Sequence, residues 1–284
     1  MKAKRAMEED IKIIDLVIEL LDARAPLSTR NPDIDSLAKG KARMVLLNKA
    51  DLADERSTKE WKEYFKKNGI TAVSLDSRNR KSLRSIDDGV QTACREKIEK
   101  NKKKGIIFRP MRAMVLGIPN VGKSTFINSY AGKAVAKTGN KPGVTKGKQW
   151  VRLGKNLELL DTPGILWPKI DDDTAGFHLA LIGSMNDEVL NRDDMARRFL
   201  REISAISPEI LYNTYGITEE MSVDEMLFQV AENRNALKKG GMPDTEKAVS
   251  LIINDFRSGK LGRITLDRVP EHAGYEKDQE IRGI

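Results

Sequence analysis

Short apolar runs, each ending in a polar loop, recur through the first 160 residues of the chain. They lie at residues 16–21, 44–47, 72–75, 114–116 and 157–160. Continuous apolar runs of this length are typical of parallel strands that are buried on both faces. Helix-like stretches separate most of them, such as residues 57–68, which offer Ser57 or Thr58 as a cap and Gly69 as a stop. Alternating strands and helices predict an α/β fold with a doubly wound, mostly parallel sheet.

The pattern changes after about residue 172, where the apolar runs stop and helical candidates follow. These candidates are residues 193–206, 222–232 and 245–257. Asp244 or Thr245 can cap the last of them, and Gly259 can end it. A length of 284 residues also exceeds one average domain. We therefore expect an α/β domain over residues 1–172 and a smaller, all-helical domain over residues 173–284.

A glycine-rich loop follows the predicted strand at residues 114–116. Its sequence, Gly117-Ile-Pro-Asn-Val-Gly-Lys-Ser124, has the spacing G-x-x-x-x-G-K-[ST] between a strand and a helix. Glycines let backbone N–H groups approach phosphate oxygens, and the start of the next helix adds its positive dipole end. The alternative is a glycine turn that only opens a helix. The predicted nucleotide contacts of this loop are Asn120, Val121, Gly122, Lys123, Ser124 and Thr125.

A second motif, Asn48-Lys-Ala-Asp51, comes at the end of the predicted strand at residues 44–47. Guanine presents a ring N–H beside an exocyclic amine, so one carboxylate at Asp51 can accept both hydrogens, whereas adenine would leave that acid unsatisfied. Asn48 can bond the other edge of the base, and the stem of Lys49 can lie on its face. An Asn-capped turn is the alternative. The predicted base contacts are Asn48, Lys49, Ala50 and Asp51, with Asp76 and Ser77 added by their position after the next strand.

Two loops downstream of the glycine-rich loop complete a site for a nucleoside triphosphate with Mg²⁺. Thr145 lies in a Gly/Pro-rich segment, and Asp161-Thr-Pro-Gly164 follows the predicted strand at residues 157–160. We expect Ser124, Thr145 and Asp161 to hold Mg²⁺, and the Gly164 N–H to contact the γ phosphate. The predicted catalytic residues are Lys123, Thr145 and Gly164.

The order of these motifs along the chain is base, phosphate, first switch, second switch, whereas Ras-like GTPases begin with the phosphate loop. Domain termini often lie close together, so joining the old ends and opening a surface loop preserves the spatial order of strands. The sequence therefore predicts a circularly permuted Ras-like GTPase domain. A P-loop ATPase or kinase fits less well, because Asp51 would face an adenine that it cannot satisfy.

Ile165 stands where a Ras-type enzyme has the glutamine that orients water. Another group must then stabilise the reaction, and Asn120 stands where related GTPases recruit K⁺, which could supply positive charge near the phosphates. The alternative role for Asn120 is a side chain that closes the turn.

Composition narrows the cellular setting. The chain has 39% hydrophobic residues, no apolar run near the length of a membrane span and no apolar stretch behind its basic N-terminus. A single cysteine, Cys94, fits a reducing compartment. Fifty Lys and Arg against 42 Asp and Glu give a net charge of +8, which suits either a polyanionic partner such as RNA or a solvated basic surface. We expect a cytoplasmic monomer that does not enter membranes.

The chain closely resembles the ribosome biogenesis GTPase A family of bacterial circularly permuted GTPases, over nearly all its length. Beyond the generic motifs, the likeness rests on Asp22-Ala-Arg-Ala-Pro26 with Arg30-Asn-Pro32, on the segment 138–143 and on the segment 159–168. The resemblance implies late assembly of the large ribosomal subunit, rRNA binding and GTP hydrolysis that the ribosomal particle stimulates. The family's N-terminal aromatic-Pro-Gly-His segment, whose histidine is proposed to assist hydrolysis, is not found before Met1-Lys2, so we expect that catalysis is impaired if it is missing.

We therefore expect a GTP-hydrolysing assembly factor for the large subunit, with GTP and GDP, rRNA and the subunit precursor as partners, Mg²⁺ as cofactor and K⁺ as a candidate. The alternative is a nucleotide-gated RNA-binding factor with little hydrolysis of its own. The second switch leads into the helical domain, where either an RNA contact or a solvated face could use the basic residues. His178 and His272 are expected to be ordinary surface or packing residues. The candidates for RNA contact are Lys238, Lys239, Lys247, Arg257, Lys260 and Arg263.

Overall fold

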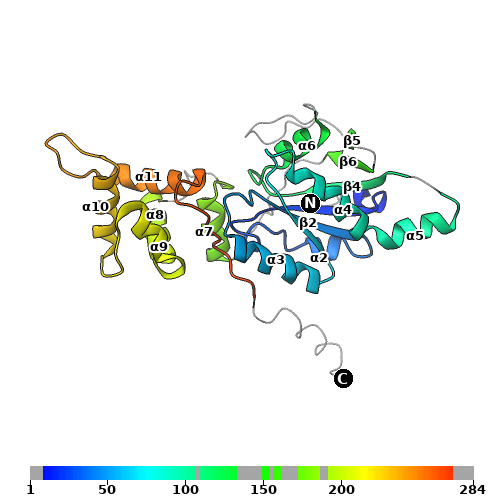
Figure 1. Ribbon diagram of the computed structural model, residues 1–284, viewed down its shortest axis with the longest axis horizontal. Coiled ribbons are helices and arrows are strands. Elements are labelled where there is room, and N and C mark those ends of the chain that lie inside the picture. Colours follow the sequence, from blue (N-terminus) through cyan, green and yellow to red (C-terminus); the bar gives the residue numbers. More distant parts are fainter. Residues whose placement is uncertain are drawn as a thin grey trace, which may run out of the picture. The chain divides into compact units, whose positions relative to one another are not determined.

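The computed structural model describes residues 9–106, 109–132, 149–153, 156–161, 172–185 and 191–270 (Figure 1). The chain divides by packing into two compact units. One consists of Met1–Ile170 together with Thr265–Ile284, and the other is Asp171–Ile264. We call them the sheet unit and the helical unit. No helix among the described residues is both long and apolar enough to cross a membrane.

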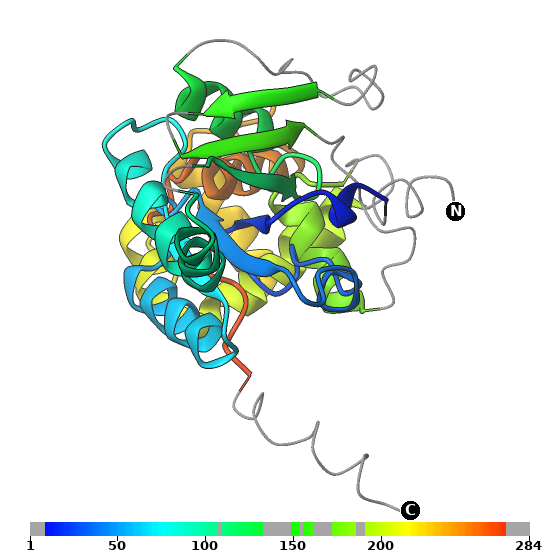
Figure 2. The ribbon, with the colours of Figure 1, turned by 90° about the vertical axis from the view of Figure 1, so that its right-hand side faces the viewer.

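In the described part of the sheet unit, six strands form one sheet in the order β3-β2-β1-β4-β6-β5. All described neighbours pair in parallel except β5 and β6, the green antiparallel pair at the top of Figure 2. The strands are β1 (Leu16–Asp22), β2 (Ala42–Asn48), β3 (Thr71–Ser74), β4 (Met111–Leu116), β5 (Gln149–Leu153) and β6 (Leu157–Asp161). The predicted mostly parallel α/β sheet is confirmed, although the sequence pattern missed β5.

Helices cover both faces of this sheet. The helical elements described in this unit are α2 (Ile34–Leu37), α3 (Glu55–Lys67), the short 3₁₀ turn η1 (Ser82–Arg84), α4 (Ser85–Ala93), α5 (Arg95–Lys103) and α6 (Lys123–Ala131). Trp61 and Phe65 of α3 pack on the face that carries Val45 and Leu47. On the opposite face α4 lies so close that a Cβ on Gly89 would come within 2.8 Å of a methyl group of Val73. This close approach explains a glycine in the middle of a helix.

The start of α3 differs from the expected one. Its cap is Asp54, whose Oδ1 accepts from the Ser57 N–H at 2.7 Å, so the predicted cap at Ser57 or Thr58 is wrong. The cap lies three residues before Ser57, because the Asp54 carboxylate already satisfies an N–H group of the first turn.

The helical unit contains α7 (Asp173–Leu181), α8 (Arg192–Ile206), α9 (Pro208–Tyr215), α10 (Val223–Asn233) and α11 (Thr245–Ser258). Phe199 and Phe256 meet in its core with ring centroids 4.9 Å apart. The buried Asp255 accepts from the Tyr215 hydroxyl at 2.7 Å and pairs with Arg234, which satisfies its charge inside the unit. The predicted helical segments correspond to α8, α10 and α11.

After the helical unit the chain returns to the sheet unit, which the sequence pattern gives no sign of. Residues 265–270, which the expected division assigns to the helical domain, pack with the sheet unit instead. The Asp267 carboxylate accepts from the N–H and hydroxyl of Ser28 at 2.7 and 2.8 Å, and its carbonyl accepts from the Trp61 indole N–H at 3.3 Å. The Thr265 hydroxyl accepts from the Asp54 N–H at 3.1 Å. We call residues 265–269 the return strap.

Candidate nucleotide-binding site

Most of the predicted site residues lie at the carboxyl edge of the parallel sheet. β1 ends at Asp22, β2 at Asn48, β3 just before Leu75, and β4 just before Gly117. Ligands of open α/β sheets bind beyond this edge, because the loops that follow the strands converge there. The base motif and the phosphate loop therefore meet across β1, although nearly 70 residues separate them in the chain.

Both glycines of the phosphate loop are required by close backbone contacts. Gly122 has φ of 98°, and a Cβ there would lie 2.4 Å from the Asn48 side-chain nitrogen. A Cβ on Gly117 would lie 2.9 Å from the carbonyl oxygen of Leu20 in β1. Larger residues would push the loop away from the strands that support it.

The phosphate loop leads directly into α6. The Phe126 N–H bonds to the Gly122 carbonyl at 2.8 Å, so the N–H groups of residues 123–125 come before the start of the helical ladder. Such N–H groups and the helix dipole favour an anion at this end. Lys123, Ser124 and Thr125 thus occupy the first turn of α6, as the motif requires.

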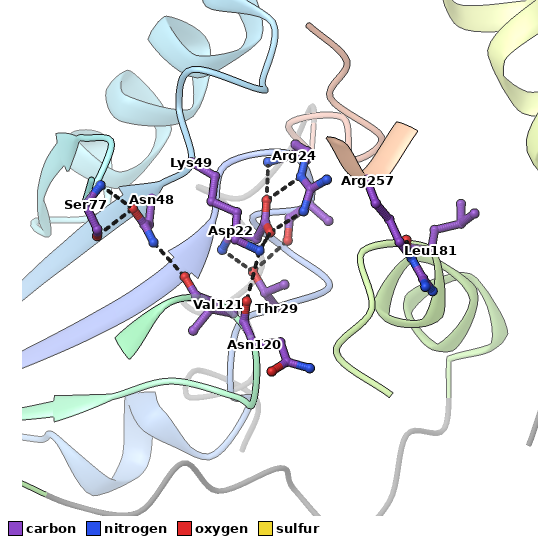
Figure 3. Close-up of polar contacts among 11 residues, drawn as sticks. Asp22, Arg24, Thr29, Asn48, Lys49, Ser77, Asn120, Val121, Leu181 and Arg257 are labelled. Carbon is purple, nitrogen blue, oxygen red and sulfur yellow. Dashed lines mark hydrogen bonds and ion pairs between the residues drawn. The ribbon is translucent and has the colours of Figure 1, made fainter. Parts of the chain in front are cut away.

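The buried side chain of Asn48 joins three loops (Figure 3). Its Nδ2 donates to the Val121 carbonyl at 2.7 Å, and its Oδ1 accepts from the Ser77 N–H at 3.0 Å and the Ser77 hydroxyl at 2.7 Å. The two partners fix the amide orientation, because a carbonyl can only accept and an N–H can only donate. Asn48 therefore holds the phosphate loop and the Ser77 loop on either side of the base motif, while Ser77 uses its N–H and hydroxyl on Asn48.

Lys49 makes a second link to the phosphate loop (Figure 3). Its Nζ donates to the Asn120 carbonyl at 2.9 Å and lies 2.8 Å from Oδ2 of Asp22. Asp22 is fully buried and also binds Arg24, whose Nε and Nη2 donate to its two oxygens at 2.9 and 2.8 Å. Burial alone would raise the pKa of Asp22, but the charges of Arg24 and Lys49 outweigh it and hold that pKa well below its usual range.

The sequence motifs did not assign Asp22 and Arg24 to the site, and the two residues entered only through the family resemblance. The sequence nevertheless contains a signal for Asp22. Asp22 is an acid that ends a strand which is otherwise apolar apart from Glu19, in the same position that Asn48 takes in β2.

Asp51 shows one engaged and one unengaged carboxylate oxygen. Its Oδ2 accepts from Nη2 of Arg78 at 2.5 Å, while its Oδ1 is buried and accepts no hydrogen bond from any residue that the structure describes. Arg78 also donates to Asp76, from its N–H at 2.9 Å and its Nε at 3.2 Å. The Ala50 N–H bonds to the Leu75 carbonyl at 3.1 Å and fixes the base motif beside the end of β3.

The predicted metal ligands are only partly within the description. Ser124 lies in the first turn of α6, and Asp161 is the last residue of β6, where only its backbone is described. Thr145 and Gly164 lie outside the described residues. The donor set of hydroxyl and carboxylate oxygens suits Mg²⁺. Asn120 has φ of 63° and its carbonyl serves Lys49, while its predicted side-chain contact with K⁺ stays a prediction.

In the helical unit, Arg257 has a structural task. Its Nε donates to the Leu181 carbonyl at 2.9 Å (Figure 3). Its Nη2 donates to the Ala180 carbonyl at 2.7 Å, and the two bonds satisfy the end of α7. Of the other RNA candidates, Lys238 pairs with Glu246 at 3.6 Å, and Lys239 and Lys247 are exposed. The guanidinium of Arg257 is therefore poorly placed to serve as an RNA contact.

His178 is buried, and its Nε2 lies 2.7 Å from Oε1 of Glu202. This contact fits the packing role expected for His178. His272 lies outside the described residues.

Comparisons with known proteins agree with this geometry. A family model described as 50S ribosome-binding GTPase matches residues 112–236. Ribosome biogenesis GTPase A from Bacillus cereus is 45% identical over 280 residues, covering 98% of this chain and 95% of the relative. The protein of the same name from Thermotoga maritima is 36% identical, and the match covers 100% of this chain and 97% of the relative.

Solved structures support the same assignment. A GDP-bound YlqF structure is 32% identical with a TM-score of 0.65, and covers 94% of this chain and 100% of its own. A GNP-bound YlqF from T. maritima is 34% identical with a TM-score of 0.63, and covers 94% and 98%. The chain is thus a GTP-binding enzyme that hydrolyses GTP, and it belongs to the ribosome biogenesis GTPase A family.

Proposed function

We propose that this GTPase acts in late maturation of the large ribosomal subunit, where its nucleotide state controls binding to the subunit precursor and its rRNA. Relatives at 45% and 36% identity carry ribosome biogenesis in their names, and the matching family model is described as 50S ribosome-binding. The net charge of +8 suits a partner rich in phosphate. The protein would act in the cytoplasm as a monomer.

The observation that carries the nucleotide side of this proposal is the Asn48 junction. One buried amide binds Val121 and Ser77, so the base loop, the Ser77 loop and the phosphate loop form one preorganised rim. The base motif precedes the phosphate loop in the chain, yet β2 and β4 both border β1. This arrangement supports a circularly permuted GTPase domain, since permutation changes the connections and not the neighbours.

Guanine selection would rest on Asp51. Its buried Oδ1 would accept a hydrogen from the base, while Arg78 holds the other oxygen. A buried acceptor without a donor is costly, so a base with matching N–H groups gains affinity over adenine.

On the phosphate side, Lys123 and the first-turn N–H groups of α6 would stabilise the negative charge of the β and γ phosphates. Ser124, Thr145 and Asp161 would hold Mg²⁺, which supplies positive charge to the transferred phosphoryl group when bound. The Gly164 N–H would respond to the γ phosphate, and Asn120 would support a K⁺ ion near the same oxygens.

Coupling to the helical unit would use both of its connections. The second switch leads into the helical unit at Asp171, and the return strap leaves it at Thr265. In the strap, the Leu266 N–H donates to the Arg24 carbonyl at 2.7 Å. Arg24 binds Asp22, and Asp22 in turn pairs with Lys49. A ligand shifts a conformational equilibrium only by its differential affinity, so the GTP and GDP forms should differ by about 5- to 150-fold in particle affinity.

The test is co-sedimentation with large ribosomal subunits across a salt series, comparing a non-hydrolysable GTP analogue with GDP. We expect tighter binding in the GTP state and a steep loss with salt. Lys239→Glu with Lys247→Glu should weaken particle binding and leave GTP affinity of the isolated protein intact. The matched control is Lys39→Glu with Lys67→Glu, an equal charge change on exposed lysines of the sheet unit. Equal pelleting in both nucleotide states would remove the proposed coupling.

A further inference from the structure

Asp22 occupies a position that the nucleotide motifs do not include. It ends β1 directly opposite Asn48 in the parallel register, and the Ala23 N–H bonds to the Asn48 carbonyl at 2.7 Å. The backbone hydrogen bonds between β1 and β2 therefore extend to the residue after Asp22, and the Asp22 carboxylate lies beside Lys49. The register of two strands, rather than a sequence motif, creates this contact.

Three groups fix the Asp22 carboxylate before any ligand binds. Arg24 donates to it from its backbone N–H at 3.1 Å, from Nε at 2.9 Å and from Nη2 at 2.8 Å. The Asp22 N–H itself bonds to the Thr29 hydroxyl at 3.2 Å, which holds the loop after β1 in place. The strap adds a further anchor, because the Leu266 N–H bonds to the Arg24 carbonyl. The carboxylate is thus a rigid anion in a fully buried position.

Lys49 lies between this anion and the phosphate loop. Its Nζ is 2.8 Å from Asp22 and donates to the Asn120 carbonyl at 2.9 Å, while its side chain is 25% exposed. A lysine stem that is partly in solvent has many rotamers, and ordering it only when a ligand binds would reduce affinity. Because Asp22 holds the Lys49 ammonium before a ligand binds, the side chain does not have to be ordered on binding.

We propose that Asp22 is a positioning residue for guanine-nucleotide binding, which fixes the Lys49 ammonium against the phosphate loop and is itself held by Arg24. This inference rests on the proposed nucleotide site and adds to it a residue outside the base and phosphate motifs. Asp22 acts through Lys49, so its effect on affinity depends on the presence of the Lys49 ammonium.

A double-mutant cycle tests this dependence by titration with a fluorescent GDP derivative. Asp22→Asn keeps the shape of the side chain and an oxygen for Arg24, but removes the charge that holds Lys49. We expect the Kd to rise about 3- to 10-fold in the unaltered background, the effect of ordering one long side chain. In the Lys49→Met background the same change should alter the Kd by less than about 2-fold.

Thermal unfolding measures the structural part of the Asp22 side chain, whereas the dependence of the Kd on Lys49 measures its positioning role. Asp22→Asn should lower the melting temperature in both Lys49 backgrounds, because Arg24 loses a buried partner. If Asp22→Asn does not fold, the neutral pair Asp22→Asn with Arg24→Gln leaves no uncompensated buried charge, and its effect on the Kd should again require Lys49. Phe65→Leu, a core change on the buried face of α3, is the control for destabilisation alone and should leave the Kd unchanged.

Equal loss of affinity with and without the Lys49 ammonium would overturn this inference while the proposed function stands. Failure of the unaltered protein to bind GDP would overturn the proposed function, and this inference with it.

Discussion

Replacing Asn48 should reveal how much of the nucleotide site is organised by one amide. Asn48→Ala removes the donor to Val121 and the acceptor for two groups of Ser77. Three hydrogen bonds at about 1 kcal/mol each give a loss of about 3 kcal/mol. For a unit of this size that corresponds to a fall of about 6–12 °C in melting temperature. The loss should not depend on pH, since alanine does not ionise.

Asn48→Asp makes the sharper test because the shape is kept. An oxygen then replaces Nδ2 at 2.7 Å from the Val121 carbonyl oxygen, and a charge enters a side chain that is 2% exposed. Burial and the facing carbonyl should raise the pKa of the new carboxyl. A protonated carboxyl can donate to Val121 again, so its stability should be present at low pH and lost as pH rises through the raised pKa.

The assay is thermal unfolding without nucleotide between pH 4.5 and 8, with every variant compared with the unaltered protein at the same pH. Asn68→Ala and Asn68→Asp are matched controls, because Asn68 is exposed and makes one side-chain bond to the Tyr64 carbonyl. They should change the melting temperature by less than about 2 °C. The reasoning is refuted if Asn48→Ala resembles these controls, or if the deficit of Asn48→Asp is the same at both ends of the pH range.

Four further outcomes are expected. Asp51→Asn should weaken GTP binding and favour xanthine nucleotides, whose base has an oxygen in place of the guanine amine; equal affinity of the unaltered protein for ATP and GTP would remove this assignment. Lys123→Ala or Ser124→Ala should lose Mg²⁺-dependent GTP binding or turnover, by about 10²-fold or more in rate, and an unchanged rate and affinity in both would make the loop structural. K⁺ should accelerate hydrolysis more than Na⁺ at matched ionic strength, and Asn120→Ala should abolish the difference; identical rates in the two salts would reject a K⁺ site. Burial raises the pKa of Glu19 above its ordinary value of 4.5 despite two nearby arginines, so the stability from its protonated form is present below that value and lost as pH rises through the raised pKa. The melting temperature of Glu19→Gln relative to the unaltered protein should therefore increase from pH 4 to pH 8, and a constant difference would contradict this.

The sequence predicts those parts of the fold and site that depend on local pattern. Buried parallel strands read as continuous apolar runs, so β1, β2 and β4 are visible in the sequence. Gly122 is equally visible, because the spacing of the phosphate loop requires a residue that tolerates positive φ.

What the sequence does not predict depends on surroundings that are distant in the chain. β5 is an edge strand in which the exposed Trp150 alternates with the buried Val151, so it lacks a continuous apolar run. The contact between Asp22 and Lys49 follows from strand register, which no single motif encodes. Arg257 resembles any other basic residue until the carbonyls at the end of α7 are placed beside it.

The return strap also determines the order in which the two units can complete their folding during synthesis. Ser28 and Asp267 are hydrogen-bonded although 239 residues separate them, and the Trp61 indole also donates to Asp267. Domains usually fold in the order in which they leave the ribosome, and contacts of high sequence separation form late. The sheet unit begins to fold before the helical unit but is completed after it. The strap residues that bind the loop at Ser28 emerge only after the whole helical unit has been made. A nascent chain therefore carries a nearly complete nucleotide site whose contacts with the return strap form only after the helical unit has been made.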